Sequence, residues 1–318
     1  MHFTTRQALA AGVSRRRLRS RDLTAPFHGV RRSVADVRAQ QRKNSAETGP
    51  LAITRRIMRD AAALAHAYAP AMSPQSFYAG RTVLALRGLP FADAEILDVG
   101  VIAPRRAPRA RGVRGRKIEE RLVQIEVIGG LRISNASTTW AMLARELTER
   151  ELTILADAML HIPRDSSGTR DPARALVTHA ELEEAMSVPG RPRFGRLHAA
   201  LARARTGSAS VLESEYRLDA EDGSLPGAEL DVEIFDTKGR RIGISEIVYP
   251  KYRLVVEIEG DHHRTSRAQW NRDIDKYRDY ADAGWEVVRI TSAHIRIQRS
   301  AVQTVRAALL RKGWRPGN

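Results

Sequence analysis

Three glutamates lie where two neighbouring strands are expected to meet. Glu246 falls on a strand predicted over residues 242–249, and Glu257 and Glu259 fall at the end of the next apolar run. A turn centred on residues 251 and 252 would pair these strands so that Glu246 faces Glu257. Side chains two residues apart on a strand share a face, so Glu259 is expected beside Glu257.

Three carboxylates placed together repel one another, which destabilises a sheet unless something neutralises them. A hard divalent cation such as Mg²⁺ or Mn²⁺ binds oxygen ligands and would hold such a cluster. Without a cation, at least one of the carboxyl groups is expected to have a raised pKa. The alternative is a solvent-facing acidic patch that neighbouring Arg and Lys side chains neutralise.

A pair of histidines follows this acidic cluster directly. His262 and His263 come two residues or so after the last glutamate. An imidazole can bind a metal, transfer a proton or contact a phosphate group. The pair is a weak signal alone, and its place next to the carboxylates strengthens the prediction of a catalytic site.

The elements that must position these residues follow one another clearly from residue 208 onward. Ser208 or Ser210 is expected to open a helix that carries Leu212 and Tyr216 four residues apart. Gly284 is expected to end a later helix whose predicted apolar face consists of Trp270, Ile274, Tyr277 and Ala281. The predicted order is this first helix, strands over 230–235, 242–249 and 253–258 with a hairpin turn at 236–239, a helix over 266–283, a strand over 285–290 and a helix over 293–311.

This part of the chain resembles the very-short-patch-repair-like endonuclease domain of the PD-(D/E)XK superfamily. The resemblance is carried by residues 246–250, 255–264, 269–273 and 283–291, and it covers about 208–298. It implies a restriction-endonuclease-like αβββαβ domain and Mg²⁺- or Mn²⁺-dependent hydrolysis of phosphodiester bonds.

The resemblance also implies roles for single residues. Glu257 takes the position of an acidic metal ligand, His263 that of a catalytic histidine, and Glu213 that of a supporting acidic residue on the first helix. For Glu213 the alternative is a surface pair with Arg217 at i,i+4 spacing. The family has Asp where this chain has Glu246 and usually where it has Glu259, and no Lys stands two residues after Glu257.

Positive charge is concentrated at the start of the chain. Residues 1–43 contain eleven Arg and Lys residues against two Asp. Thr4 or Thr5 can cap a short helix that Gly12 ends, and Ser14 can cap a second helix over residues 15–20. Two short helices, the second rich in Arg, form a helix-turn-helix pattern that can enter the DNA major groove. A small β wing is expected around His28, and the predicted DNA-binding residues are Arg15, Arg16, Arg17, Arg19, Arg31 and Arg32.

These first forty residues resemble the N-terminal winged-helix domain of AbiEi-type antitoxins. The matching residues are 3–5 and 8–12, then Ser14 to Leu18, and Phe27 to Val30. The resemblance implies DNA binding, usually for promoter autoregulation. The alternative is a basic helical hairpin that docks on another domain.

Residues 50–203 predict a mixed α/β middle domain without recognisable chemistry. A basic block over residues 105–117 is interleaved with Pro and Gly, which favours a loop, either a linker or an arm that contacts phosphates. Helices are expected around 77–86, 138–147 and 152–160, and strands around 95–102 and 122–128.

Composition supports a multidomain α/β protein with a polyanionic partner. The 318 residues suggest domains over 1–45, 50–203 and 208–318, and the net charge is +16. The absence of Cys excludes disulfides and Cys-type zinc sites. No stretch has the length of a membrane span, so a cytoplasmic, nucleoid-associated location is expected.

These observations predict a DNA-binding protein with a metal-dependent endonuclease-like domain, a hydrolase. The alternative is a DNA-binding transcriptional regulator or antitoxin whose nuclease domain is inactive, which the Asp-to-Glu change at Glu246 favours. A partner from a toxin–antitoxin or phage-defence system is also compatible with the sequence, as is a homodimer on a symmetric DNA site.

Overall fold

The structure is a computed structural model that describes residues 2–49, 51–93, 95–165, 167–259 and 267–317. The chain forms two compact units, the first of Met1–Leu155 with Val177–Ala202 and the second of Ala156–Leu176 with Arg203–Asn318. Helices and mixed sheets occur in both units, so the protein has the predicted mixed α/β class. Among the helices of the described residues, none combines the length and apolar character that crossing a membrane requires.

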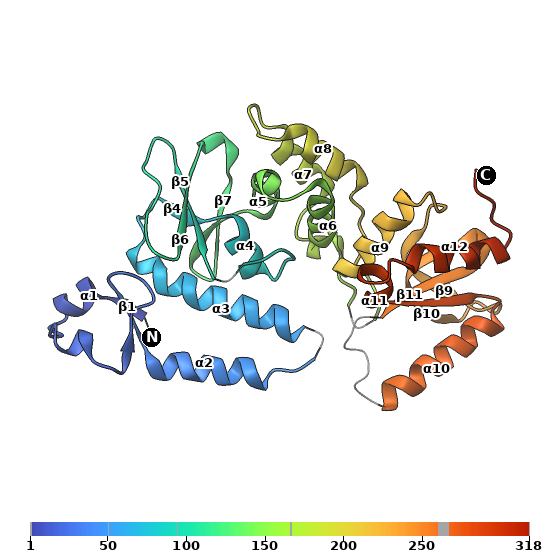
Figure 1. The fold of residues 1–318 in the computed structure, drawn as a ribbon, viewed down its shortest axis with the longest axis horizontal. Helices are drawn as coiled ribbons and strands as arrows, with labels where there is room; N and C mark the ends of the chain where they lie inside the picture. Colours follow the sequence, from blue (N-terminus) through green and yellow to red (C-terminus); the bar gives the residue numbers. More distant parts are fainter. Residues whose placement is uncertain (1, 50, 94, 166, 260–266, 318) are drawn as a thin grey trace. The chain divides into compact units, whose positions relative to one another are not determined.

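The first unit begins with a small three-stranded sheet in the order β1-β3-β2. Thr4 caps the first helix: its hydroxyl accepts a hydrogen bond from the Gln7 backbone, and the Gln7 side chain bonds back to Thr4. Strands β2 and β3 pair antiparallel and enclose His28, as predicted for the wing. The elements are β1 (His2–Thr4), α1 (Thr5–Ala10), β2 (Leu23–Thr24), β3 (Val30–Ser33) and α2 (Val34–Ala46) (Figure 1).

The second helix predicted over residues 15–20 is wrong in extent. Only Arg17–Arg19 form a single 3-10 turn. The residue that caps this turn is Arg16 and not the predicted Ser14, although the Ser14 hydroxyl accepts a hydrogen bond from the Arg17 backbone N–H at 3.2 Å. The Arg17 guanidinium donates to both Asp22 carboxylate oxygens, just before strand β2.

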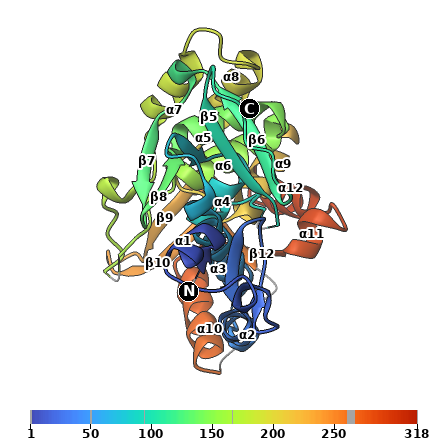
Figure 2. The ribbon, with the colours of Figure 1, turned by 90° about the vertical axis from the view of Figure 1, so that its left-hand side faces the viewer.

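A five-stranded sheet in the order β6-β5-β4-β8-β7 forms the larger part of the first unit. Helix α4 packs on strands of this sheet and on α3. Figure 2 shows β5 and β6 running side by side, and they pair parallel. The elements are α3 (Ala52–Tyr68), β4 (Ser76–Tyr78), α4 (Gly80–Arg87), β5 (Leu97–Ile102), β6 (Val113–Ile118), β7 (Ile125–Ile128), β8 (Leu131–Ser134), α5 (Ala136–Met142), α7 (His179–Ser187) and α8 (Phe194–Arg203). Helix α6 (Glu149–Leu160) begins in the first unit and ends in the second.

Two predictions for this unit need correction. The basic block expected as a loop ends in strand β6, because Val113–Ile118 pair with β5 and their arginines reach the buried Asp98. The helix expected around residues 77–86 is preceded by strand β4, whose Phe77 and Tyr78 are buried in the sheet. Apolar residues that fill a central strand and a following helix have no periodicity that separates the two.

The second unit has the predicted order of helix, three strands, helix, strand and helix. Its sheet has the order β12-β11-β10-β9, and Figure 1 shows α10 and α12 on opposite faces. One face packs against α9, α11 and α12, and the other against Tyr280 of α10. The elements are α9 (Val211–Asp222), β9 (Glu229–Phe235), β10 (Arg241–Tyr249), β11 (Leu254–Glu259), α10 (Arg267–Asp282), β12 (Glu286–Thr291), α11 (Ser292–Arg296) and α12 (Ala301–Arg311).

The predicted helix boundaries in this unit hold better than the predicted faces. Ser210 caps α9, and Gly284 follows α10 in a left-handed conformation. The predicted apolar face of α10 is wrong at Ala281, which is exposed, while Tyr277 is half-buried and the neighbouring Tyr280 and Ala283 are buried. The side chains of Trp270 and Ile274 lie outside the described residues. The last helix is in fact two, α11 and α12, with Arg299 in a left-handed conformation between them.

Candidate active site

The hairpin of β10 and β11 has the register expected from the sequence. Ile247 pairs with Val256 and Tyr249 with Leu254. Continuing this register places Glu246 opposite Glu257, but the described ladder ends at Ile247 and Val256. The two glutamates therefore lie just beyond the last paired residues, where β10 and β11 separate.

The side chains of β9 and β10 change sides at this same level. In β9, Leu230 packs in one core while Val232 and Ile234 pack in the other. Between them Asp231 has a φ of 51°, in the left-handed region that non-glycine residues rarely adopt. Simple alternation along the strand is therefore broken next to the candidate site, which sequence periodicity cannot show.

Glu246 fills the space between the separating strands. Its Oε2 accepts a hydrogen bond from the Ile258 backbone N–H at 2.8 Å, in place of a ladder bond. Burial raises the pKa of Glu246 to about 8, and repulsion from Glu213 and Glu257 adds to this, against the hydrogen bond from Ile258 and the attraction of Lys276. A free carboxyl group is thus expected to hold its proton at neutral pH.

Glu257 receives the only lysine described near this cluster. Lys276 Nζ lies 3.1 Å from Glu257 Oε1, and the Ser245 hydroxyl donates to the same oxygen at 2.8 Å. The Glu257 side chain is 13% exposed. Burial alone would lower the pKa of Lys276, but the Glu257 carboxylate raises it above its ordinary value.

Lys276 is a site residue that the sequence analysis did not identify. The sequence has no lysine two residues after Glu257, and the ammonium beside Glu257 comes from helix α10. A usable signal was its position four residues before Tyr280, on the buried face of the helix. The error in the predicted helix face hid this signal.

Glu213 is almost completely buried, with 4% of its surface exposed. Its Oε2 accepts a hydrogen bond from the Ala209 backbone N–H at 2.7 Å. Burial raises the pKa of Glu213, and repulsion from Asp231 and Glu257 adds to it, against the hydrogen bonds from Ala209 and Ser210. The alternative pair with Arg217 is not formed, because Arg217 binds Asp157 at 2.7 Å and Glu221 at 2.6 Å.

Of the remaining candidate residues, the structure describes Glu259 but neither His262 nor His263. Glu259 forms an ion pair with Arg289 of the neighbouring strand β12. This contact agrees with the alternative in which arginine neutralises part of the acidic patch. His262 and His263 lie outside the described residues.

The charges of Glu213, Glu246 and Glu257 are incompletely neutralised. The pKa values of Glu213 and Glu246 are both raised, and repulsion from another glutamate of this group contributes to each rise. Oxygen donors that repel one another are suited to a hard cation, so the chemistry of this set fits Mg²⁺ or Mn²⁺. In the part of the chain that the structure describes, no three acidic, His or Cys side chains are arranged closely enough to hold a metal ion.

The arginines predicted to bind DNA fall into two groups. Arg15, Arg16 and Arg19 are exposed around the 3-10 turn. Arg17 is paired with Asp22. The other two also make contacts within the chain, since Arg31 donates to the Leu18 carbonyl and Arg32 to the Gln40 side chain.

Comparisons of the chain with protein-family models, with curated proteins and with solved structures find no match. The roles of these residues therefore have to be argued from their geometry and their charge. The two features that carry such an argument are the partly buried glutamates at the end of the β10–β11 ladder, with the buried Glu213 of α9, and the exposed arginines of the first unit.

Proposed function

We propose that this protein binds DNA and hydrolyses phosphodiester bonds with the help of Mg²⁺ or Mn²⁺. The observation that supports this most is the group of three glutamates, the buried Glu213 and the partly buried Glu246 and Glu257, with a lysine paired to Glu257. A protein rarely keeps such groups together unless they bind or react. A protein with this role would act on the nucleoid in the cytoplasm.

The side chains suggest a division of labour. Glu213, Glu246 and Glu257 would hold the cation only after their side chains move together, because among the described residues no three such groups lie close enough to hold a metal ion. The cation would supply Lewis acidity to the hydrolysis of the phosphodiester. Glu246, whose pKa is about 8, has to release its proton to become an anionic ligand. The Lys276 ammonium beside Glu257 would stabilise negative charge that develops on the phosphate.

The finer architecture belongs to the same proposal. The order of helix, three strands, helix, strand and helix in the second unit supports a restriction-endonuclease-like αβββαβ domain, which is what the very-short-patch-repair-like resemblance implies. The first forty residues would act as a winged helix of the AbiEi antitoxin type. Arg15, Arg16 and Arg19 would then contact DNA phosphates.

Cleavage of supercoiled plasmid in Mg²⁺ or Mn²⁺ tests the proposal. Wild type should nick the plasmid, and Glu257→Gln should lose about a hundredfold or more of that activity at equal DNA occupancy. The matched control is Glu286→Gln, on the adjacent strand, where Glu286 pairs with Arg311 at the surface. Nicking that persists in Glu257→Gln would overturn the assignment of the site.

A second candidate function is a DNA-binding regulator or antitoxin with an inactive nuclease domain. Glu213 favours it, because hydrogen bonds to Ala209 and Ser210 give this residue a structural role at the start of α9. Glu257 favours it as well, because it is already paired with Lys276. Salt-sensitive DNA binding by wild type, with no metal-dependent cleavage of plasmid or of the protein's own promoter DNA, would support this function instead.

A further inference from the structure

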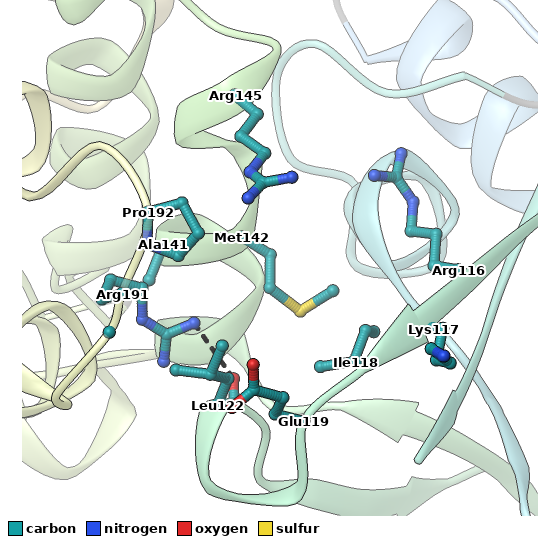
Figure 3. Close-up of a pocket in the computed structure, with 11 residues that line it drawn as sticks. Arg116, Lys117, Ile118, Glu119, Leu122, Ala141, Met142, Arg145, Arg191 and Pro192 are labelled. Atoms are coloured by element: carbon teal, nitrogen blue, oxygen red, sulfur yellow. Dashed lines mark hydrogen bonds between the residues drawn. The ribbon is translucent and has the colours of Figure 1, made fainter. Parts of the chain in front are cut away.

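The first unit contains a cavity that the proposed nuclease function does not use. Its volume is about 400 Å³, which is in the range of small-molecule sites. Figure 3 shows its walls, which come from strand β6, helix α5 and the turn before α8. The lining combines basic side chains with apolar ones, and both kinds bear on what the cavity can hold.

The most informative residue is Arg191, which is 8% exposed. Its Nε donates to the Ala185 carbonyl at 2.8 Å and its Nη1 to the Leu122 carbonyl at 3.0 Å. Among the described residues no carboxylate forms an ion pair with it. A buried cation without a counter-charge is costly, so this guanidinium calls for an anion.

Electrostatics around Arg191 point the same way. Burial lowers the pKa of Arg191, and repulsion from Arg121 lowers it further. The one acidic residue of the lining, Glu119, is paired with Arg121 at 2.6 Å. The charge that remains around this wall of the cavity is therefore positive.

Two more basic residues reach the cavity from its rim. Arg145 and Lys117 are exposed, and Figure 3 shows the Arg145 guanidinium extending toward the side of Met142 from the 3-10 turn Leu143–Arg145 that follows α5. Arg116 also lines the cavity, but Asp98 and Glu146 neutralise it. Arg145 and Lys117 can thus meet an anion at the mouth while Arg191 meets it at the wall.

The rest of the lining is apolar. Ile118, Leu122, Met142 and Pro192 lie between the basic groups. A polarisable thioether and a flat proline ring suit the face of an aromatic ring. The preferred ligand therefore has a multiply charged anionic end and a flat, weakly polar body.

We propose that this cavity binds a small phosphorylated ligand of nucleotide size, such as a nucleoside diphosphate. The phosphates lie between Arg145 and Arg191, and the base packs against Met142 and Pro192. The guanidinium groups suit phosphate because they donate several hydrogen bonds in one plane. This binding is independent of the proposed nuclease function, because every residue involved belongs to the first unit.

Calorimetric titration of the full chain with ADP at fixed ionic strength tests the proposal. Wild type should bind ADP, and Arg145→Glu should weaken binding by about tenfold or more, because it reverses a charge at the phosphates. Arg132→Glu is the matched control, since Arg132 is exposed on strand β8 of the same unit and outside the lining. Arg191→Met should also lose binding, and its melting temperature shows whether it still folds.

Further titrations separate this proposal from its alternatives. Glu257→Gln should bind ADP like wild type, whatever its effect on DNA cleavage. Inorganic pyrophosphate should bind more weakly than ADP, because it lacks the base. No heat with ADP at millimolar concentration, or equal losses in Arg145→Glu and Arg132→Glu, would overturn the proposal. Binding of a short single-stranded oligonucleotide alone, lost in Arg145→Glu, would also overturn it and assign the cavity to a nucleic-acid surface.

Discussion

One carboxylate of the first unit and one group of carboxylates in the second are neutralised differently. In the first unit Asp98 has no exposed surface, and Arg114 and Arg116 donate to its carboxylate at 2.9 and 3.1 Å. The Arg81 backbone N–H at the start of α4 adds a third donor at 2.9 Å. In the second unit Lys276 pairs with Glu257 alone of the three glutamates Glu213, Glu246 and Glu257, and Glu246 reaches a pKa of about 8.

The difference separates a structural carboxylate from a candidate site. Asp98 is tightly enclosed: a Cβ added at Gly80 would lie 2.8 Å from its Oδ2, and Gly80 itself has a positive φ of 53°. Space for a ligand is absent there, and so is any unmet charge. Around Glu246 the number of acids exceeds the number of cations, so a proton or a metal ion has to supply the balance.

Removal of Asp98 should have the largest effect on stability. Asp98→Ala leaves Arg114 and Arg116 beside each other without their common partner, so the free energy of unfolding should fall by about 3 kcal/mol. Chemical denaturation measures it. Glu119→Ala, which removes a surface pair with Arg121, should change stability by about 1 kcal/mol or less. Similar losses in both variants would contradict the structural role of Asp98.

A neutral substitution at Glu246 should, in contrast to Asp98→Ala, raise the free energy of unfolding relative to wild type as the pH increases. The folded-state pKa of Glu246 is about 8, above its ordinary 4.5, so its stabilising proton is fully bound below pH 4.5 and lost as the pH rises through 8. Glu246→Gln cannot ionise. Its stability relative to wild type should therefore increase by up to about 1.4 kcal/mol per pH unit between these values. Unfolding of both proteins from pH 4 to 9 measures this, and parallel curves would contradict it.

Lys276 should matter less, and a metal should replace part of its effect. Lys276→Met removes the partner of Glu257 and should cost about 1–3 kcal/mol at pH 8. Because a divalent cation supplies the missing charge, 10 mM or so of Mg²⁺ should stabilise this variant more than wild type. Thermal melts with and without Mg²⁺ check it. Lys312→Met, which breaks a longer surface pair with Glu286, is the control and should not respond to Mg²⁺.

The smallest effects are expected for exposed arginines, whose charge is either free or neutralised by a nearby carboxylate. Arg16 is exposed, whereas Asp22 already neutralises Arg17. Arg16→Ala should weaken DNA binding a few-fold and reduce the slope of log K against log salt by about 1. Arg17→Ala should reduce that slope less. Fluorescence anisotropy at several salt concentrations distinguishes them, and equal slopes for both variants would remove the distinction.

Local chemistry in the sequence was sufficient to predict several features of the structure. The cap at Ser210, the hairpin turn after Phe235 and the glycine after α10 depend on residues that are adjacent in the chain. The register of β10 against β11 followed from the centre of one short turn. Such features can be predicted because the groups that interact are a few residues apart.

Three features were predicted wrongly or not at all, because they depend on residues that are far apart in the chain. They are the buried face of α10, the strand in the basic block and the break at Asp231. Asp231 holds its left-handed conformation with Arg164 bound to its carboxylate at 2.9 Å, 67 residues away along the chain. Val113–Ile118 form a strand because β5 offers a free edge. Tertiary partners override local preference in each case.

The sequence alone determined which acidic residues this protein has and that its charge suits a polyanion. Only the tertiary structure decided which of those acids have counter-ions. Arg114 and Arg116 neutralise Asp98, Arg289 pairs with Glu259, and Glu246 depends on a backbone N–H. The reason is physical: burial and neighbouring charge set the pKa of a carboxyl group, and both depend on residues brought together by the fold.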